Sequence, residues 1–240
     1  MKDRFLGLMK AFRVAFPYTL PIFTGYLFIG TAFGVMFAQK SYGVEWATLM
    51  SVTVYAGAGQ YLATNFFIEG VSLIHICFLT LMVNIRHIFY GISLLEPFSK
   101  MGKMKWYMAF TLTDETYSLL CTTRKPECVS QKQFLFAIAF LDHFYWIAGS
   151  IIGSLMGTLI PFDATGIDFA MTALFVVILV EQWMNKENRF PICLGLITAA
   201  IMLVIIGPDA FILPTMLIII LFLIIGRGRL DKSRNEVADV

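Results

Sequence analysis

The sequence predicts an all-α protein, a polytopic helical membrane protein. Of its 240 residues, 58% are hydrophobic, 15% are aromatic and only 14% are charged, whereas about 25% of the residues in soluble domains are charged. Apolar runs of about 17 to 25 residues, the length that crosses a bilayer as a helix, recur along the chain. These runs are continuously apolar, whereas a transmembrane barrel requires alternating apolar and polar residues. The chain is therefore expected to lie in a lipid bilayer as a set of helices.

Seven runs have the length of a membrane segment: residues 16–38, 47–68, 72–95, 134–160, 168–184, 190–206 and 208–226. An eighth candidate, residues 105–121, is apolar at both ends but carries Asp114 and Glu115 at its centre. We therefore expect seven to eight membrane segments in one transmembrane domain, residues 16–226.

The two ends of the chain are more polar. Residues 1–15 contain basic residues but no short apolar core followed by a cleavage site, which predicts a retained amphipathic lead-in. Residues 227–240 form a polar, basic C-terminal tail.

The distribution of Lys and Arg bears on the topology, because cytoplasmic loops carry an excess of these residues. An eight-segment and a seven-segment arrangement give equal asymmetry. A third arrangement folds residues 47–68 into a re-entrant pair of half-helices, interrupted at "AGAGQ", and gives the strongest inner excess. All three put the C-terminus in the cytoplasm. Two of them also put the N-terminus there, and we expect both ends to be cytoplasmic.

Two parts of the chain echo each other. "GTAFG" at residues 30–34 is followed by "GVEWA" at 43–47, and "GSIIG" at 149–153 is followed by "GIDFA" at 166–170. This pattern favours an internal repeat, either inverted or parallel, because many transporters are built from repeated halves. The alternative is that small residues four apart serve only close helix packing. The expected halves are residues 16–121 and 134–226.

Three polar residues lie close together in an apolar run: Asn84, Arg86 and His87. An arginine at the bilayer centre costs at least about 2.5 to 3.5 kcal/mol on insertion scales. Arg86 should therefore face the protein interior or a water-filled cavity and have a partner. One interpretation is a structural pin, with Arg86 paired to an acidic residue, either Asp114, Glu115 or Asp142. The other is that Arg86 faces an anionic group in a substrate or ion path.

The stretch "YAGAGQYLATN" supplies a second candidate for this path. Gly57 and Gly59 weaken the helix, and an unwound backbone offers free carbonyl and amide groups where it lines a cavity. Tyr55, Gln60 and Asn65 add side-chain donors and acceptors. Alternatively, the glycines only allow helices to approach each other closely.

Acidic residues are candidates for carrying a proton. Asp114 and Glu115 lie in an otherwise apolar segment, or else on a solvated loop or re-entrant tip. Asp142 and His143 are weaker candidates, because "LDHFYW" is also typical of an interfacial aromatic belt with a salt-bridged histidine.

No enzyme motif is present: the chain lacks HExxH, a Walker loop and GxSxG. An intramembrane metalloenzyme would require His87, His143 and carboxylates to meet around a metal, and their spacing does not demand this. We expect no catalytic site, no metal and no cofactor.

The elements "PIFTGYLFIGTAFG", "YAGAGQ", "VNIRH", "TDETYSL" and "GIDFAMTALF" come in the order seen in the AzlC family, which the chain resembles from about Pro17 to Pro208. Members of this family are the large subunits of two-component branched-chain amino-acid exporters. The resemblance implies a small, hydrophobic AzlD-type partner subunit and a bacterial inner-membrane location. It also implies proton-driven export of neutral apolar amino acids, with no nucleic-acid partner.

The chemistry of the residues fits this resemblance. A zwitterionic amino acid needs an anion-stabilising group, a cation-stabilising group and an apolar pocket. Arg86, an acidic residue near Asp114 and Glu115, and walls rich in Phe, Met and Leu can supply them. The alternative is a structural or channel-like subunit whose polar residues only pin helices together.

Overall fold

The computed structural model describes residues 2–64, 66, 72–123, 126–159, 169–184, 189–208, 211, 214–215, 217–222 and 224–225. All regular secondary structure in these residues is helical, which confirms the predicted all-α class. The chain forms two compact units, Met1–Ala170 and Met171–Val240. Three parts of the predictions lie outside the described residues: Asn65, residues 166–168 of "GIDFA", and the C-terminal tail, residues 227–240.

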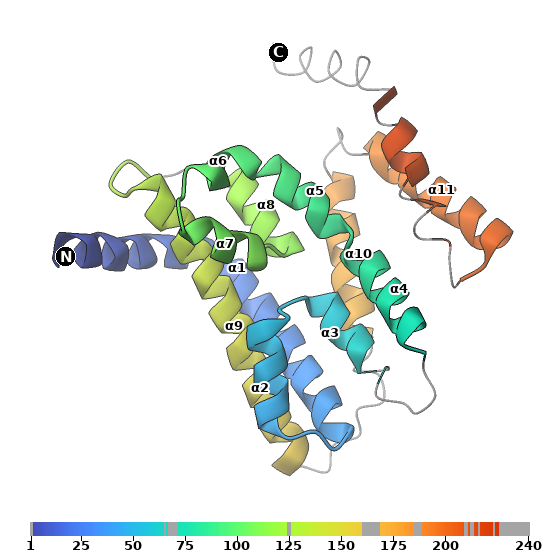
Figure 1. Cartoon of the computed structure of the whole chain (residues 1–240), viewed down its shortest axis with the longest axis horizontal. Helices are drawn as coiled ribbons and strands as arrows, with labels where there is room; N and C mark the ends of the chain where they lie inside the picture. Colours follow the sequence, from blue (N-terminus) through green and yellow to red (C-terminus); the bar gives the residue numbers. More distant parts are fainter. Residues whose placement is uncertain are drawn as a thin grey trace. The chain divides into compact units, whose positions relative to one another are not determined.

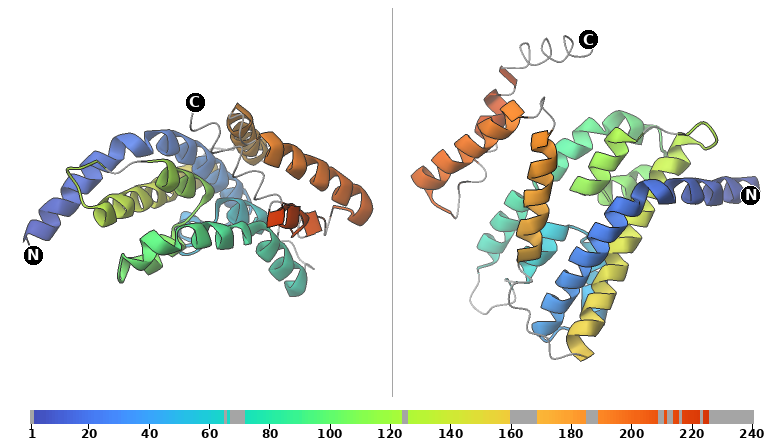
Figure 2. Two further views of the ribbon diagram at one scale, coloured as in Figure 1. Left: turned by 90° about the horizontal axis from the view of Figure 1, so that it is seen from above. Right: turned by 180° about the vertical axis from the view of Figure 1, so that it is seen from behind.

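Two long helices form the centre of the first unit. α1 (Lys2–Gln39) and α9 (Gln131–Leu159) lie side by side (Figure 1). α1 contains Pro17 and Pro21, and it bends between its N-terminal part and the part beside α9, as both views of Figure 2 show. Proline removes a helical hydrogen bond and bends the helix. Residues 2–15 of the expected lead-in (residues 1–15) belong to this helix.

Small residues let α1 and α9 approach closely. A Cβ atom added at Gly30 would meet backbone atoms of Trp146, Gly149 and Ser150. One added at Gly34 would meet backbone atoms of Ser150, Gly153 and Ser154. The two echoing glycine motifs therefore pack directly against each other, as small-xxx-small motifs do in membranes. These glycines therefore serve close helix packing, and the internal repeat stays a prediction.

The predicted membrane segment at residues 47–68 contains an interruption, as expected for a pair of half-helices. α2 (Val44–Thr53) ends before Val54, and α3 (Gly57–Ala63) begins at Gly57. Between them, Tyr55 has a φ of 42°, in the left-handed region that bulky residues rarely adopt. The break predicted near Ala56 to Gln60 is present and lies slightly earlier in the chain. It separates two short half-helices.

The middle of the chain consists of short helices: α4 (Leu73–Asn84), α5 (Arg86–Ser93), α6 (Leu95–Ser99), α7 (Met104–Phe110) and α8 (Asp114–Thr122). The eighth candidate segment, residues 105–121, is therefore interrupted between α7 and α8. α7 has seven residues and spans about 10 Å, against a hydrocarbon core of about 30 Å. Neither half crosses a bilayer alone.

A buried apolar cluster joins α6, α7 and α8 to the central pair. It includes Met108 of α7, Phe134 and Ile138 of α9, and Ala11 and Ala15 of α1. The N-terminal residues expected to form a separate lead-in thus contribute to the core.

The second unit contains most of α10 (Phe169–Met184) and all of α11 (Arg189–Ile206). Among the described residues, four helical stretches are long and apolar enough to cross a membrane: Leu6–Gln39, Ile76–Ser93, Gln131–Leu159 and Arg189–Ile206. They match four of the predicted segments. The remaining predicted crossings and the internal repeat stay predictions. α10 runs without the interruption that separates α2 from α3.

Candidate functional site

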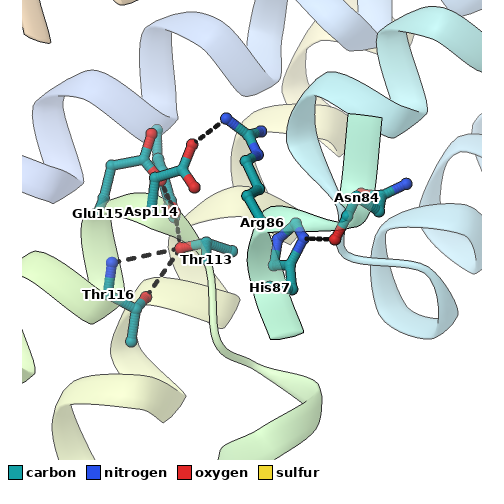
Figure 3. A network of polar contacts seen from close by, with 8 residues as sticks. Asn84, Arg86, His87, Thr113, Asp114, Glu115 and Thr116 are labelled. Atoms are coloured by element: carbon teal, nitrogen blue, oxygen red, sulfur yellow. Dashed lines mark hydrogen bonds and ion pairs between the residues drawn. The ribbon is translucent and has the colours of Figure 1, made fainter. Parts of the chain in front are cut away.

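An ion pair joins the two polar elements predicted from the sequence. Arg86 is the first residue of α5 and Asp114 the first residue of α8. The Arg86 Nη1 and Asp114 Oδ2 atoms are 2.5 Å apart, and the side chains are only 26% and 19% exposed (Figure 3). Asp114, Glu115 and Asp142 were the possible acidic partners of Arg86, and the ion pair is formed with Asp114. The other carboxylate oxygen, Asp114 Oδ1, is buried and has no hydrogen-bond partner among the described residues.

The N-terminus of α8 positions the acidic residues. Thr113 is the N-cap of this helix, and its hydroxyl accepts a hydrogen bond from the backbone N–H of Thr116 at 3.3 Å. Asp114 and Glu115 lie in the first turn, where the helix dipole stabilises negative charge. Local capping therefore places the Asp114 carboxyl group against Arg86, with Glu115 next to Asp114 in the first turn.

Side-chain hydrogen bonds connect Glu115 to Asp142 of α9. The Tyr26 hydroxyl lies 2.8 Å from Glu115 Oε2 and 2.5 Å from Thr113 Oγ1. Thr113 Oγ1 lies 3.1 Å from Thr116 Oγ1, which lies 2.9 Å from Asp142 Oδ2. We call these five side chains the hydroxyl row. Figure 3 shows its part around Thr113.

Asp142 is fully enclosed. It is 0% exposed, makes no ion pair with a described residue, and its Oδ1 atom has no hydrogen-bond partner among them. A buried polar atom without a partner costs about 1–3 kcal/mol. α9 places Asp142 in the interior of the protein, and the interpretation of "LDHFYW" as an interfacial belt stays a prediction.

His143 binds the end of the interrupted helix. Its Nε2 atom lies 3.2 Å from the Ser51 carbonyl oxygen and its Nδ1 atom 3.0 Å from the Tyr107 hydroxyl. The last carbonyl groups of a helix lack partners within the helix, and His143 supplies one to α2. The Tyr55 ring packs on the imidazole, with 4.3 Å between ring centroids. His143 makes no salt bridge with a described residue.

Gln60 attaches the start of α3 to α9. It is 0% exposed; its Oε1 atom accepts a hydrogen bond from Trp146 Nε1 at 2.9 Å, and its Nε2 atom donates to Ser51 Oγ at 3.2 Å. A Cβ atom at Gly57 would lie 3.5 Å from the Trp146 ring. Gln60 and Gly57 thus make internal packing contacts, a role that the sequence left open beside ligand binding.

Asn84 and Gly59 lie together, apart from the ion pair. A Cβ atom at Gly59 would lie 3.1 Å from Asn84 Nδ2, which donates to the Thr80 carbonyl oxygen at 2.9 Å. His87 Nδ1 donates to the Asn84 carbonyl oxygen at 2.9 Å. In Figure 3, Arg86 reaches toward Asp114 while Asn84 lies on the other side of His87.

The structure therefore brings together Arg86, Asp114 and Glu115. Tyr55 and Gln60 lie at or next to the α2–α3 break and contact α9. Sequence reasoning missed the hydroxyl groups of Tyr26, Thr113 and Thr116. Among the described residues, no group of three or more His, Cys, Asp or Glu side chains could hold a metal ion.

Comparison with known proteins gives one family. The family model described as "AzlC protein" matches residues 21–160. A Bacillus subtilis relative, "Branched-chain amino acid transport protein AzlC", is 40% identical over 96% of this chain and 91% of its own length. An uncharacterized membrane protein of Haemophilus influenzae is 36% identical over 96% and 95%. "Inner membrane protein YgaZ" of Escherichia coli is 27% identical over 82% and 80%. No solved structure matches significantly.

Proposed function

The chain belongs to the AzlC family, and on this basis we propose that it is the large membrane subunit of a secondary transporter. The transporter exports branched-chain or similar neutral apolar amino acids and is coupled to protons. The observation that carries this proposal is the Arg86–Asp114 ion pair next to Glu115, within segments that are otherwise apolar. The relative named as a branched-chain amino acid transport protein gives the substrate class.

The ion pair has the charges that an amino acid requires. In our proposal, the substrate carboxylate binds the Arg86 guanidinium group, which matches carboxylate geometry with two parallel N–H donors. The substrate ammonium group binds Asp114, whose Oδ1 atom has no hydrogen-bond partner among the described residues. A bound zwitterion would then replace the internal pair without leaving either charge unpaired. Aromatic and aliphatic side chains supply the apolar pocket.

Two interrupted helices give the site a means of changing shape. The α2–α3 break and the α7–α8 break both lie in segments that pack on α9. Interrupted helices near the centre of transporters bind substrates, and their movement exposes the site to alternate sides of the membrane. We propose that these two segments move against the rigid α1–α9 pair during alternating access.

The proposal includes a partner and an orientation. The transporter pairs this chain with a small, hydrophobic AzlD-type subunit in the bacterial inner membrane, and both termini of the large subunit face the cytoplasm. Support for these features comes from the family and from the distribution of Lys and Arg.

Transport by membrane vesicles tests the proposal. Vesicles containing this chain, with and without the small subunit, are loaded with a panel of labelled amino acids, and efflux is measured with and without an imposed pH gradient. We expect leucine, isoleucine or valine to leave faster than alanine or lysine, only when both subunits are present. Activity without the small subunit would overturn the two-subunit proposal, and equal efflux of all amino acids would overturn the substrate class.

A structural or channel-like subunit is the second candidate. The observation that favours it is that Arg86, Gln60 and His143 already have partners inside the protein. In that case the polar groups only hold helices together, and removing a matched pair of charges leaves transport intact.

A further inference from the structure

The hydroxyl row runs without interruption from a partly exposed carboxyl group to a fully buried one. It consists of Glu115, Tyr26, Thr113, Thr116 and Asp142, and its four oxygen–oxygen distances are 2.8, 2.5, 3.1 and 2.9 Å in that order. All four distances are within hydrogen-bonding range.

The number of protons in the row depends on its two ends. Four hydrogen bonds need four protons, and the three hydroxyl groups supply one each. If both carboxyl groups are ionised, Tyr26 donates to Glu115, Thr113 donates to Thr116, and Thr116 donates to Asp142. The Tyr26 and Thr113 oxygens, 2.5 Å apart, are then left without a proton between them. A single proton on either carboxyl group completes the row.

We propose that this row carries a proton between Glu115 and Asp142, which makes Asp142 the inner proton site of the transporter. The inference rests on the proton coupling in the proposed function. When Glu115 is protonated, its carboxyl group donates to Tyr26, and each hydroxyl group donates to the next as far as Asp142. Transfer moves each proton across its own hydrogen bond, so that Asp142 gains one proton, Glu115 loses one, and the hydroxyl groups end neutral.

The position of the row suits this task. Glu115 lies beside Asp114, the partner of Arg86, so a proton leaving Glu115 changes the charge next to the proposed substrate site. The titratable side chains around Asp142 are Glu115 of α8, Tyr26 of α1, Tyr55 between α2 and α3, and His143 and Tyr145 of α9. Of these, the tyrosines ordinarily titrate only near pH 10, whereas Glu115 and His143 ordinarily titrate at or below neutral pH. His143 lies outside the row, because its ring nitrogens contact the Ser51 carbonyl oxygen and the Tyr107 hydroxyl.

Cutting the row tests the proposal. Tyr26→Phe and Thr116→Val each remove one hydroxyl group while keeping the shape of the side chain. The matched controls are Tyr145→Phe and Thr19→Val, which break a buried Tyr–Thr hydrogen bond of 3.0 Å outside the row. In vesicles containing both subunits, two rates are compared: leucine flux driven by a pH gradient, and counterflow exchange of labelled for unlabelled leucine, which needs no net proton movement.

We expect the ratio of gradient-driven flux to counterflow exchange to fall about a hundredfold in the two row variants, the usual loss when a positioned proton-transfer group is removed. The controls should keep the wild-type ratio. A wild-type ratio in either row variant would overturn the proposal. If the wild-type complex exchanges leucine but its leucine flux does not change with the pH gradient, the proton coupling in the proposed function is wrong instead.

Infrared spectroscopy tests the number of protons in the row directly in the wild-type complex. This measurement does not depend on transport by any variant. At neutral pH the complex should show the C=O stretching band of a protonated carboxyl group, and the Glu115→Gln/Asp142→Asn variant should lack it. Absence of this band from the wild-type complex would overturn the proposal even if the row variants did not fold.

Discussion

The close approach of α1 and α9 can be tested by adding one methyl group. Gly34→Ala places a Cβ atom against backbone atoms of Ser150, Gly153 and Ser154, closer than real Cβ atoms come to other atoms. Backbone atoms cannot rotate away as a side chain can, so the two helices have to separate. Gly25→Ala is the matched control, because Gly25 lies in the same helix and its added Cβ atom meets nothing within 4 Å.

The magnitudes of the competing effects differ. Overpacking a tight contact costs about 1–3 kcal/mol, and a gap of 0.5–1 Å between the helices forfeits about a quarter to a half of each contact's dispersion energy. Replacing Gly by Ala in a helix gains at most about 1 kcal/mol. We therefore expect Gly34→Ala to be destabilised by about 1–3 kcal/mol and Gly25→Ala to be unchanged or slightly stabilised.

Thermal unfolding in detergent, followed by tryptophan fluorescence at one scan rate, measures this difference. At about 2–4 °C per kcal/mol for a chain of this size, the midpoint of Gly34→Ala should lie roughly 2–16 °C below that of Gly25→Ala. Equal midpoints would refute the glycine-mediated packing of α1 on α9, and with it the rigid pair on which the proposed movement depends.

Two further predictions concern the α2–α3 break. Gln60→Leu leaves the Trp146 indole N–H without its acceptor, and we expect a loss of about 1–3 kcal/mol of stability in the same thermal assay; an unchanged midpoint would show that this bond contributes nothing. Single cysteines at positions 45 and 70, introduced after the four free cysteines are replaced, should react with an impermeant reagent from one side of the membrane if the segment is re-entrant, whereas labelling from opposite faces would show that it crosses.

Composition and local pattern predicted much of this architecture. Continuous apolar runs gave the helical class, and four of the predicted segments coincide with helices long enough to cross a membrane. Gly57 and Gly59 indicated the break before α3, because glycine weakens a helix wherever it occurs. The pairing of Arg86 with an acidic residue followed from the cost of leaving a charge unpaired in an apolar segment.

The failures of the sequence interpretation also have physical causes. The apolar ends of residues 105–121 favour one membrane segment, whereas Thr113 followed by Asp114 and Glu115 is a typical start of a helix. This capping pattern is the local signal for the division between α7 and α8. The burial of Asp142 and its link through Tyr26 depend on α1, α8 and α9 meeting in space. Residues so far apart in the chain give no local signal of such a contact.

The roles assigned to Gln60 and Gly57 show a related limit. A polar residue beside a glycine in an apolar segment is compatible with ligand binding and with helix packing. Only the position of Trp146, which donates to Gln60 at 2.9 Å, reveals that Gln60 has an internal partner.

The double replacement Arg86→Gln/Asp114→Asn tests the central claim, that this ion pair binds the amino acid. It removes both charges together, so no unpaired charge is left buried and the fold should survive, as thermal unfolding of the purified complex would verify. We predict that the folded double variant loses leucine transport, because neither the carboxylate nor the ammonium group of the substrate finds its partner. Leucine efflux at the wild-type rate from vesicles containing this variant would contradict the claim and leave the ion pair as a pin between α5 and α8.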